Sequence, residues 1–376
     1  LIGTLACLRE ELRNLGSDLL VVSGEPGRII GDLVKQCSID EVWHQEEPGT
    51  EEAAEASSVA RVLQGGPARV RTFHGQTLYH PEDISFEMPD VYTDFRKAAE
   101  RTRAVRPPMP QPAKLPPLPL PVERFDIDSQ IGLPTVAALS GVDLPPPDPR
   151  AAIQFAGGQS NALRRLERYI WEQDLLKTYK ETRNGLLGAD YSRKLSPWLA
   201  NGSLSAKTVY QEVKRYESER VRNQSTYWLI FELIWRDYFW FLMRAYGRRM
   251  FVLSGPMRRY REWRDNELDF ERWRLGRTGE PFIDANMREL AATGYMSNRG
   301  RQNVASYLAR DLQVNWLWGA EYFESILVDY DPASNYGNWT YTVGVGTDPR
   351  LDRYFDPLQQ AAKYDPTGAF RRHWLA

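Results

Sequence analysis

The chain has 376 residues, 42% of them hydrophobic, and a formal net charge of −2 at pH 7. No apolar run approaches the roughly 18–20 residues that a membrane-spanning helix needs, which argues against an integral membrane protein. Cys7 and Cys37 are the only cysteines. They are too few for a disulfide framework, and no Cys/His cluster has the spacing of a zinc site. The length predicts two domains.

The start of the chain carries no visible targeting signal. It opens with LIGTLACLREELRNLG, without a start methionine, signal peptide or transit peptide, so targeting information can be missing. The low cysteine content favours a reducing, intracellular compartment. This compartment is the cytoplasm, or an organelle if a transit peptide is missing.

Charge is distributed unevenly along the chain. Residues 1–105 carry 11 Lys and Arg against 18 Asp and Glu, whereas residues 213–310 carry 19 against 12. Eighteen of those 19 are Arg, which pairs with phosphates in a bidentate manner and stacks on flat rings. The segment therefore indicates a polyanion partner for one face of the protein. Intramolecular salt bridges are the alternative explanation.

The first hundred residues alternate strand and helix patterns. Buried strands are predicted at residues 18–23, 41–44 and 69–73, with helices beginning near Pro26 and at Thr50 between them. This alternation predicts a parallel sheet with crossover helices. One helix precedes the first predicted strand, with no strand before it, so the α/β domain is expected to be truncated.

Residues 107–149 hold 13 of the 25 prolines. The stretch MPQPAKLPPLPLPVERF (109–125) cannot form a helix or a central strand, so it is predicted to be an extended connector. The predicted boundaries are 1–105 for a partial α/β domain, 106–150 for a Pro-rich linker and 151–376 for a second domain.

Helical patterns dominate from about residue 157 onward. Helices are predicted over residues 161–171, 206–219, 225–245, 281–292, 298–311 and 318–327. The helix at 225–245 is strongly apolar and is expected at the centre. The second domain is therefore predicted to be all-α.

Four side chains of this central helix share one face. Glu232, Trp235, Arg236 and Phe239 are spaced i, i+3, i+4 and i+7. A carboxylate on a buried helix is costly without a partner. Arg236 or another arginine can neutralise Glu232. Alternatively, the face is a pocket floor, where Trp235 stacks on a planar group and Glu232 bonds its polar edge.

A polar and aromatic cluster follows in residues 329–348, DYDPASNYGNWTYTVGVGTD. Asp329, Asp331, Asn335, Trp339 and Tyr341 fall close together in this stretch. Carboxylates, an amide and aromatic rings indicate the wall of a pocket for a flat, polar ligand. A solvated acidic loop beside ordinary core aromatics is the alternative.

Long motifs carry a family resemblance. STYWLIFELIWRDYFWFL (225–242), TGEPFIDANMRELAATGYMSNRGRQNVASYL (278–308) and the 329–348 stretch resemble the photolyase/cryptochrome flavoproteins. TYKETRNGLLGADYSRKLSPWLANGSLS (178–205) resembles their cryptochrome DASH branch. The resemblance covers nearly the whole chain. It implies an α/β domain that can carry an antenna pigment, a linker, and a larger all-α domain that binds folded FAD.

The resemblance implies which residues bind FAD. They are Tyr179, Ser192, Arg193, Lys194, Leu195, Ser196, Arg301, Asp329, Tyr330, Asp331 and Asn335. Backbone N–H groups of the 192–196 loop would hold the diphosphate at a helix N-terminus. The family usually has a small hydroxyl residue where this chain has Arg193. Arg301 would pair with Asp329. Asn335 would face the flavin N5, where an amide can hydrogen-bond several redox states without supplying a proton.

The resemblance also assigns the substrate side. Glu232 and Trp235 match residues that bond and stack a flipped pyrimidine dimer, and Asn335 and Tyr341 complete the predicted catalytic set. Tyr341 stands where ordinary DNA photolyases have Trp, a departure typical of the DASH branch. A phenol offers less stacking area than an indole. Trp235 and Tyr341 would therefore hold a flipped lesion less tightly than two indoles. Such weaker binding is consistent with a preference for lesions that are already unpaired, as in single-stranded DNA.

Further roles follow from the same resemblance. The predicted DNA-binding residues are Glu232, Trp235, Arg236, Asn298 and Arg299. Trp339, Trp316 and Trp263 match three tryptophans that relay an electron to the photoexcited flavin.

An antenna site is the last assignment that the resemblance supplies. The branch binds the folate 5,10-methenyltetrahydrofolate beside a Glu that follows a strand. Glu46 is the first candidate here, and Glu47 is the alternative. The stretch can also be an ordinary acidic loop, and a deazaflavin is the other candidate pigment.

The expected function is blue-light-dependent repair of cyclobutane pyrimidine dimers in single-stranded DNA, through photoinduced electron transfer from FAD. The alternative is a blue-light photoreceptor or nucleic-acid-binding regulator with little repair activity. Single-stranded or locally unpaired DNA is the expected partner, and RNA is a further candidate. A monomer without membrane association is expected.

Overall fold

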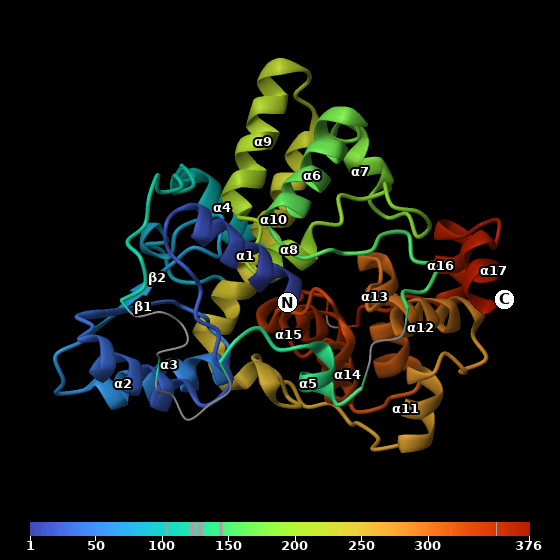
Figure 1. The fold of residues 1–376 in the computed structure, drawn as a ribbon. Helices are drawn as coiled ribbons and strands as arrows, with labels where there is room; N and C mark the ends of the chain where they lie inside the picture. Colours follow the sequence, from blue (N-terminus) through green and yellow to red (C-terminus); the bar gives the residue numbers. More distant parts are fainter. Residues whose placement is uncertain (103, 120–124, 126–130, 143–145, 351) are drawn as a thin grey trace.

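The computed structural model describes residues 1–102, 104–119, 125, 131–142, 146–350 and 352–376. A small α/β part lies on one side of the molecule, and helices make up the rest (Figure 1). This division confirms the predicted fold class, an α/β N-terminal part followed by a larger all-α part.

Two parallel strands form the sheet of the N-terminal part. β1 (Glu41–Gln45) pairs with β2 (Arg69–Phe73), and Glu41 lies opposite Arg69. α3 (Thr50–Leu63) provides the crossover, and α2 (Pro26–Cys37) packs beside it. These four elements lie together at the left of Figure 1. They confirm two of the three predicted strands, the parallel pairing and the helix starts at Pro26 and Thr50.

The predicted strand at residues 18–23 is wrong. Among the described residues of this segment, Val22 alone forms a bridge, an antiparallel one with Ile131. Leu20 and Val22 instead pack around Ile29 and Phe125, so the connector covers this segment. An apolar run reports burial, but a strand also needs a neighbouring strand with which to pair.

The first helix lies against the helical part of the protein. α1 (Ile2–Asn14) runs beside α6 (Gln159–Glu167). The Thr4 hydroxyl accepts a hydrogen bond from the Gly158 N–H at 3.3 Å. The two ends of this interaction are far apart in the sequence, so the helix helps to join the two parts of the chain.

The connector contains little regular structure where it is described. Residues 109–119 form no helix or strand, which confirms the prediction for that portion. The predicted connector, residues 106–150, also includes residues 120–124, 126–130 and 143–145, which lie outside the described residues. Further along, Val136–Ser140 form the short helix α5, capped by the Thr135 side chain.

The remaining helices form the helical part of the protein, and the first of them still lies within residues 1–105. They are α4 (Tyr92–Thr102), α7 (Tyr179–Thr182), α8 (Ser196–Ala200), α9 (Ala206–Glu219), α10 (Gln224–Tyr246), α11 (Glu267–Arg274), α12 (Pro281–Thr293), α13 (Asn298–Ser306), α14 (Trp316–Ile326), α15 (Pro332–Val343), α16 (Pro357–Tyr364) and α17 (Ala369–Leu375). Single π-helical turns extend α6 over Arg168–Glu172 and α13 over Tyr307–Asp311. All six predicted helices are present. Within the described residues, the sequence patterns missed α4, α5, α7, α11, α15, α16 and α17, whereas α8 is the helix that the resemblance places at the 192–196 loop.

α10 is the central helix, as predicted. The Asn223 side chain and Thr226 form a capping box at its start. Thirteen of its 23 residues are buried, and α4, α7, α9 and α15 all pack against it. Leu78, Tyr92 and Phe95 belong to the same hydrophobic core. These residues of the predicted α/β domain therefore pack with the helical part.

No helix in the described part of the chain is long and apolar enough to cross a membrane.

Candidate functional site

A cavity of about 460 Å³ opens in the helical part of the protein. This volume lies within the range of roughly 300–1,000 Å³ that is typical of small-molecule sites. The walls come from α7, α8, α10, α13, α14 and α15, together with the loop that precedes α8. Most predicted site residues line it: Tyr179, Ser192, Arg193, Lys194, Leu195, Ser196, Glu232, Trp235, Arg236, Asn298, Arg301, Asp329, Tyr330, Asp331, Asn335, Trp339 and Tyr341.

The loop at residues 192–196 is held from behind by a buried arginine. The Arg165 guanidinium donates to the carbonyl oxygens of Ser192 and Arg193 at 3.0 Å each. It also pairs with Asp190 at 2.7 Å. Because the carbonyls are engaged on the side of Arg165, the loop is held in one conformation. This arrangement favours binding of an anion by the opposite, N–H side of the backbone.

Lys194 is the conformational outlier of this loop. Its φ of 49° lies in the left-handed region, which is unusual for a residue other than glycine. The side chain is buried, with Nζ 4.3 Å from the centroid of Tyr191 and 4.9 Å from that of Tyr295. Burial lowers the pKa of Lys194, and the nearby Glu289 carboxylate acts in the opposite direction. Strained residues of this kind concentrate at binding sites.

Arg301 and Asp329 form a tight ion pair at the cavity wall. Nη2 of Arg301 lies 2.9 Å and 2.8 Å from the two carboxylate oxygens of Asp329. The Asp329 side chain is only 2% exposed. The Arg301 Nε also donates to the Met296 carbonyl at 3.0 Å. The pair that the sequence suggested is therefore formed, and its charges are largely compensated.

Asp331 and Asn335 lie on the first turns of α15. The Asp331 carboxylate caps the helix by accepting the Ser334 N–H at 2.6 Å. The Asn335 Nδ2 donates to the Ala320 carbonyl on α14 at 3.0 Å. This bond orients the amide and leaves its Oδ1 without a donor among the described residues. A polar ligand can therefore donate to this oxygen.

Glu232 is neutralised by an arginine that the sequence did not indicate. Arg183 Nη1 donates to Glu232 Oε1 at 2.5 Å, and the Trp228 indole N–H donates to the same oxygen at 3.1 Å. Arg236 is not the partner of Glu232. Its guanidinium donates to the carbonyls of Gln76 at 2.5 Å and Leu199 at 3.1 Å. The two alternatives for this helix face are therefore compatible. Glu232 is paired with an arginine, and it also lies at the cavity wall.

Aromatic rings flank Trp235 on α10. Tyr92 stacks on it at a centroid distance of 3.6 Å, and Tyr341 meets it edge-on at 5.4 Å. The Tyr341 hydroxyl accepts a hydrogen bond from Arg353 at 3.4 Å, and Arg353 pairs with the buried Asp348. Tyr92, Arg183 and Arg353 therefore complete this part of the site, and no motif in the sequence identified them.

Some predicted site residues lie outside the cavity lining. Arg299 donates to Gln302 and Asn184 and stacks over Tyr364. Glu46 lies 2.8 Å from His74 and 3.1 Å from Arg244. The DNA-binding role of Arg299 and the antenna role of Glu46 stay predictions.

The three tryptophans of the predicted relay occupy different environments. Trp339 lies at the cavity wall, Trp316 is fully buried, and Trp263 is half-buried. In the described part of the chain, no ring contact joins Trp339 to Trp316 or Trp316 to Trp263. The ring neighbours of Trp339 are Phe323 at 5.2 Å and Trp273 at 6.3 Å. The order of the relay stays a prediction.

Many arginines of the basic segment 213–310 are engaged within the chain. Arg244 pairs with Glu46, Arg274 with Glu271 and Arg301 with Asp329. Arg236 and Arg259 donate to backbone carbonyls instead. Intramolecular contacts therefore account for part of the Arg excess, as the alternative explanation proposed.

Comparisons with known proteins identify the family of the chain. The profile described as "FAD binding domain of DNA photolyase" matches residues 228–376, and the profile described as "DNA photolyase" matches residues 1–114. The chain is 51% identical to the Gloeobacter violaceus protein named cryptochrome DASH, over all of the chain and 74% of the relative. It is 48% identical to the Xenopus laevis protein of that name, over all of the chain and 71% of the relative.

Solved structures of a cryptochrome and a photolyase also match the fold of this chain. The Synechocystis cryptochrome superposes with a TM-score of 0.93 at 44% identity, over 99% of this chain and 76% of that one. A class III photolyase from Agrobacterium tumefaciens gives a TM-score of 0.84 at 29% identity, over 100% and 76% of the two chains. The chain therefore belongs to the cryptochrome DASH branch of the photolyase/cryptochrome family of FAD-binding proteins.

Proposed function

We propose that the cavity described above holds FAD, and that the protein uses blue light to repair cyclobutane pyrimidine dimers in single-stranded DNA. The observation that carries the proposal is that one cavity joins two different walls. One wall carries Arg301, Asp329 and Asn335, and the other carries Glu232 and Trp235. A flavin against the first wall would face a base lesion against the second.

The donors and acceptors of the first wall fit FAD. The diphosphate needs N–H donors and positive charge, which the 192–196 loop with Arg193 and Lys194 offers. Hydroxyl and ring N–H groups need acceptors, which Asp331 and the unused oxygen of Asn335 offer. Tyr330 lies beside them on the same wall. Held there in its reduced form, FAD would supply a light-excited electron that opens the cyclobutane ring and then returns.

The wall that would hold the flavin carries an ion pair and a fixed amide, and no uncompensated charge is needed from either. The ion pair of Arg301 and Asp329, whose nitrogen and oxygen atoms lie 2.8 Å apart, fixes one end of this wall. The bond from Asn335 to Ala320 keeps the amide turned toward the cavity. An amide cannot ionise, so Asn335 would bond the flavin without moving a proton.

The second wall suits a planar polar base. Trp235 offers a stacking surface, and Glu232 offers a carboxylate to the N–H edge of a pyrimidine. The ion pair with Arg183 at 2.5 Å compensates the charge of Glu232 and holds its carboxylate in place. Tyr341 meets Trp235 edge-on at 5.4 Å, and its phenol would offer a base less stacking area than an indole in the same position. This supports a preference for bases that are already unpaired, because their flipping costs less free energy.

Further contacts to DNA and to the antenna pigment belong to the same proposal. Arg236 and Asn298 line the cavity, and Arg299 lies next to Asn298 in α13. Residues 151–376 would form the FAD-binding domain, and residues 1–105 would contact the antenna at Glu46. Electron supply would run through Trp339, Trp316 and Trp263.

The experiment is photorepair of an oligonucleotide with one dimer, in single-stranded and duplex form, with the protein reduced. We expect blue-light-dependent repair that is faster on the single strand. The Glu232→Ala and Trp235→Ala variants should lose repair and keep FAD. The matched control is Glu219→Ala, which removes an exposed carboxylate of α9. Full turnover by the double variant Glu232→Ala/Trp235→Ala would show that the lesion binds elsewhere.

A further inference from the structure

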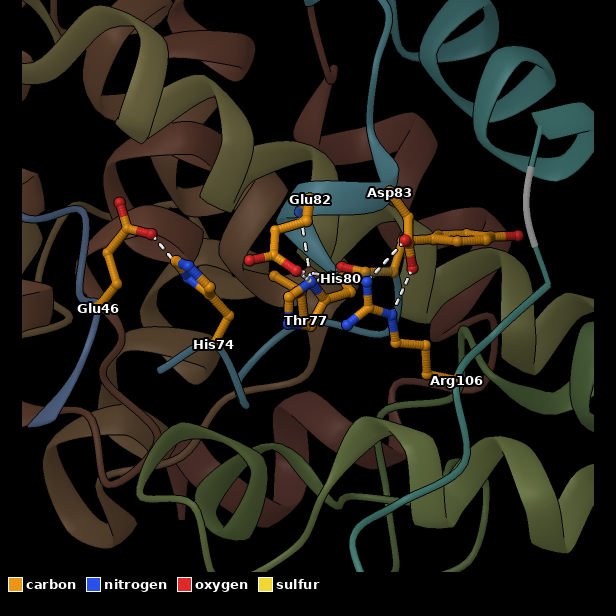
Figure 2. A network of polar contacts seen from close by, with 8 residues as sticks. Glu46, His74, Thr77, His80, Glu82, Asp83 and Arg106 are labelled. Carbon is orange, nitrogen blue, oxygen red and sulfur yellow. Dashed lines mark hydrogen bonds and ion pairs between the residues drawn. The ribbon is translucent and has the colours of Figure 1, made fainter. Parts of the chain in front are cut away.

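A short segment of the N-terminal part lies against the central helix, beside the cavity. We call residues 76–79 the strap. The segment that contains it begins just after β2 and continues into His80 and Asp83. Figure 2 shows this segment with Thr77 near its middle. At one end His74 lies 2.8 Å from Glu46, and at the other Asp83 pairs with Arg106 at 2.7 Å.

The strap is bound to α10 through one fully buried carboxylate. Asp237 is 0% exposed. Its Oδ1 accepts the Leu78 N–H at 2.9 Å, and its Oδ2 accepts the Tyr79 N–H at 2.8 Å. Leu78 is itself fully buried. Without Asp237, two backbone donors would be left unpaired in the core, and each costs free energy when unpaired.

The strap in turn contacts two residues of the cavity wall. The Gln76 carbonyl accepts a hydrogen bond from Arg236 at 2.5 Å, and the Gln76 Nε2 donates to Asp331 at 3.4 Å. Arg236 and Asp331 come from α10 and the start of α15, and both line the cavity. One residue of the strap therefore contacts both walls of the cavity.

We infer that Asp237 is a positioning residue for the FAD cavity. It holds the strap against α10, and through Gln76 the strap keeps Arg236 and Asp331 in place on the cavity walls. Asp237 itself is absent from the cavity lining, so it acts on the ligand only through these neighbours. The inference rests on the proposed assignment of this cavity to FAD, and it does not depend on repair activity.

The test measures release of FAD from the purified full-length protein, together with visible circular dichroism of the bound flavin. Asp237→Asn keeps the size of the side chain but turns one acceptor into a donor that faces a backbone N–H. We expect FAD release about tenfold faster than wild type, which corresponds to roughly 1.4 kcal/mol. We also expect an altered flavin dichroism, which a general loss of stability does not produce.

The matched control is Asp284→Asn. Asp284 is also a buried carboxylate that accepts two backbone N–H groups, those of Thr278 and Gly279. It is absent from the cavity lining and has no contact with the strap. This variant should lose thermal stability and keep the FAD release rate and flavin dichroism of the wild type.

A second variant keeps the inference testable if Asp237→Asn does not fold. Gln76→Leu leaves Asp237 and the backbone of the strap in place and removes the side-chain contact to Asp331. It should speed FAD release by a smaller factor, and adding Asp237→Asn should give less than the product of the two effects. Wild-type FAD release and dichroism in the folded variants would overturn the inference.

The Arg301→Ala variant distinguishes a wrong role for Asp237 from a wrong assignment of the cavity to FAD. If Arg301→Ala releases FAD and the strap variants do not, the role of Asp237 is wrong. If Arg301→Ala also retains FAD, the assignment of the cavity to FAD fails.

Discussion

The Tyr92 ring lies parallel to the Trp235 indole, with centroids 3.6 Å apart and an interplanar angle of 10°. Tyr92 comes from α4, so a helix that no motif indicated supports the aromatic residue proposed to stack on the lesion. The Tyr92 hydroxyl donates to the Phe231 carbonyl at 2.9 Å, which fixes the phenol to α10. One face of the indole is therefore occupied by protein, so a base would stack on the other.

Tyr92→Leu should weaken binding of a dimer-containing oligonucleotide. The variant removes the ring behind Trp235, and an aromatic pair contributes about 0.5–1.5 kcal/mol beyond its buried area. A loss of affinity of about two- to tenfold is expected in a fluorescence anisotropy titration, with FAD content unchanged. Tyr92→Phe keeps the ring and should bind nearly as tightly as wild type. Equal losses in both variants would assign the effect to the hydroxyl instead.

Arg183→Ala should reduce repair through Glu232. Arg183 is the cation that pairs with Glu232, and both side chains are about one-fifth exposed, at 20% and 18%. Removal of the arginine leaves the carboxylate with the Trp228 N–H as its remaining partner, so its charge is no longer compensated and its position is less fixed. Single-turnover photorepair by Arg183→Ala, Glu232→Gln and the double variant measures the coupling. We expect the double variant to repair no more slowly than Glu232→Gln alone; independent effects that multiply would contradict this mechanism.

Asp329→Asn should lower both FAD content and stability. The substitution removes the charge that compensates Arg301 in a site where Asp329 is 2% exposed. Breaking a buried ion pair from one side costs about 3–5 kcal/mol. The ratio of flavin to protein absorbance after purification and the thermal unfolding midpoint report the two effects. The control Asp352→Asn alters a carboxylate that is 90% exposed and should match the wild type in both measurements.

Stability in acid should depend on Asp174. Hydrogen bonds from Lys177, Tyr216 and Arg220 lower the pKa of this carboxyl from 3.8 to about 2. The folded protein therefore binds this proton more weakly than the unfolded chain does. The resulting stabilisation is present above about pH 4 and is lost as the pH falls toward 2. Urea unfolding of wild type and Asp174→Asn at several pH values should give midpoints that converge in that window. A constant difference between pH 6 and pH 2.5 would contradict the assignment.

The sequence predicted those elements whose signal is local. The helix predicted at residues 225–245 needs no knowledge of its neighbours, because its length and apolar character are local. The structure adds a capping box of Asn223 and Thr226 at the start of α10. The pairing of Arg301 with Asp329 was available only from the family resemblance. The apolar run at residues 18–23 was misread as a strand, because its packing against Phe125 depends on a distant connector.

Other contacts of the site were beyond any sequence pattern. Arg183 lies 49 positions from Glu232, and Gln76 lies 255 positions from Asp331. Periodicity carries no information about which of many arginines meets a given carboxylate. From the sequence alone, the α15 segment is interpreted as a pocket wall and not as a helix, since its glycine and its polar and aromatic residues mask the helical period.

Two glycines bring the helices around the cavity into direct contact. A Cβ on Gly337 would lie 2.4 Å from the Phe239 ring, and a Cβ on Gly319 would lie 2.4 Å from the Trp339 ring. The α15 backbone at Gly337 therefore lies directly against the Phe239 ring of α10, and the α14 backbone at Gly319 lies against the Trp339 ring of α15. None of the three helices can slide without moving a buried ring. The helices around the cavity are therefore closely packed and form a stiff frame. A change of ligand in the cavity should therefore be accommodated first by rotated side chains, because a shift of these helices would also have to displace the Phe239 and Trp339 rings.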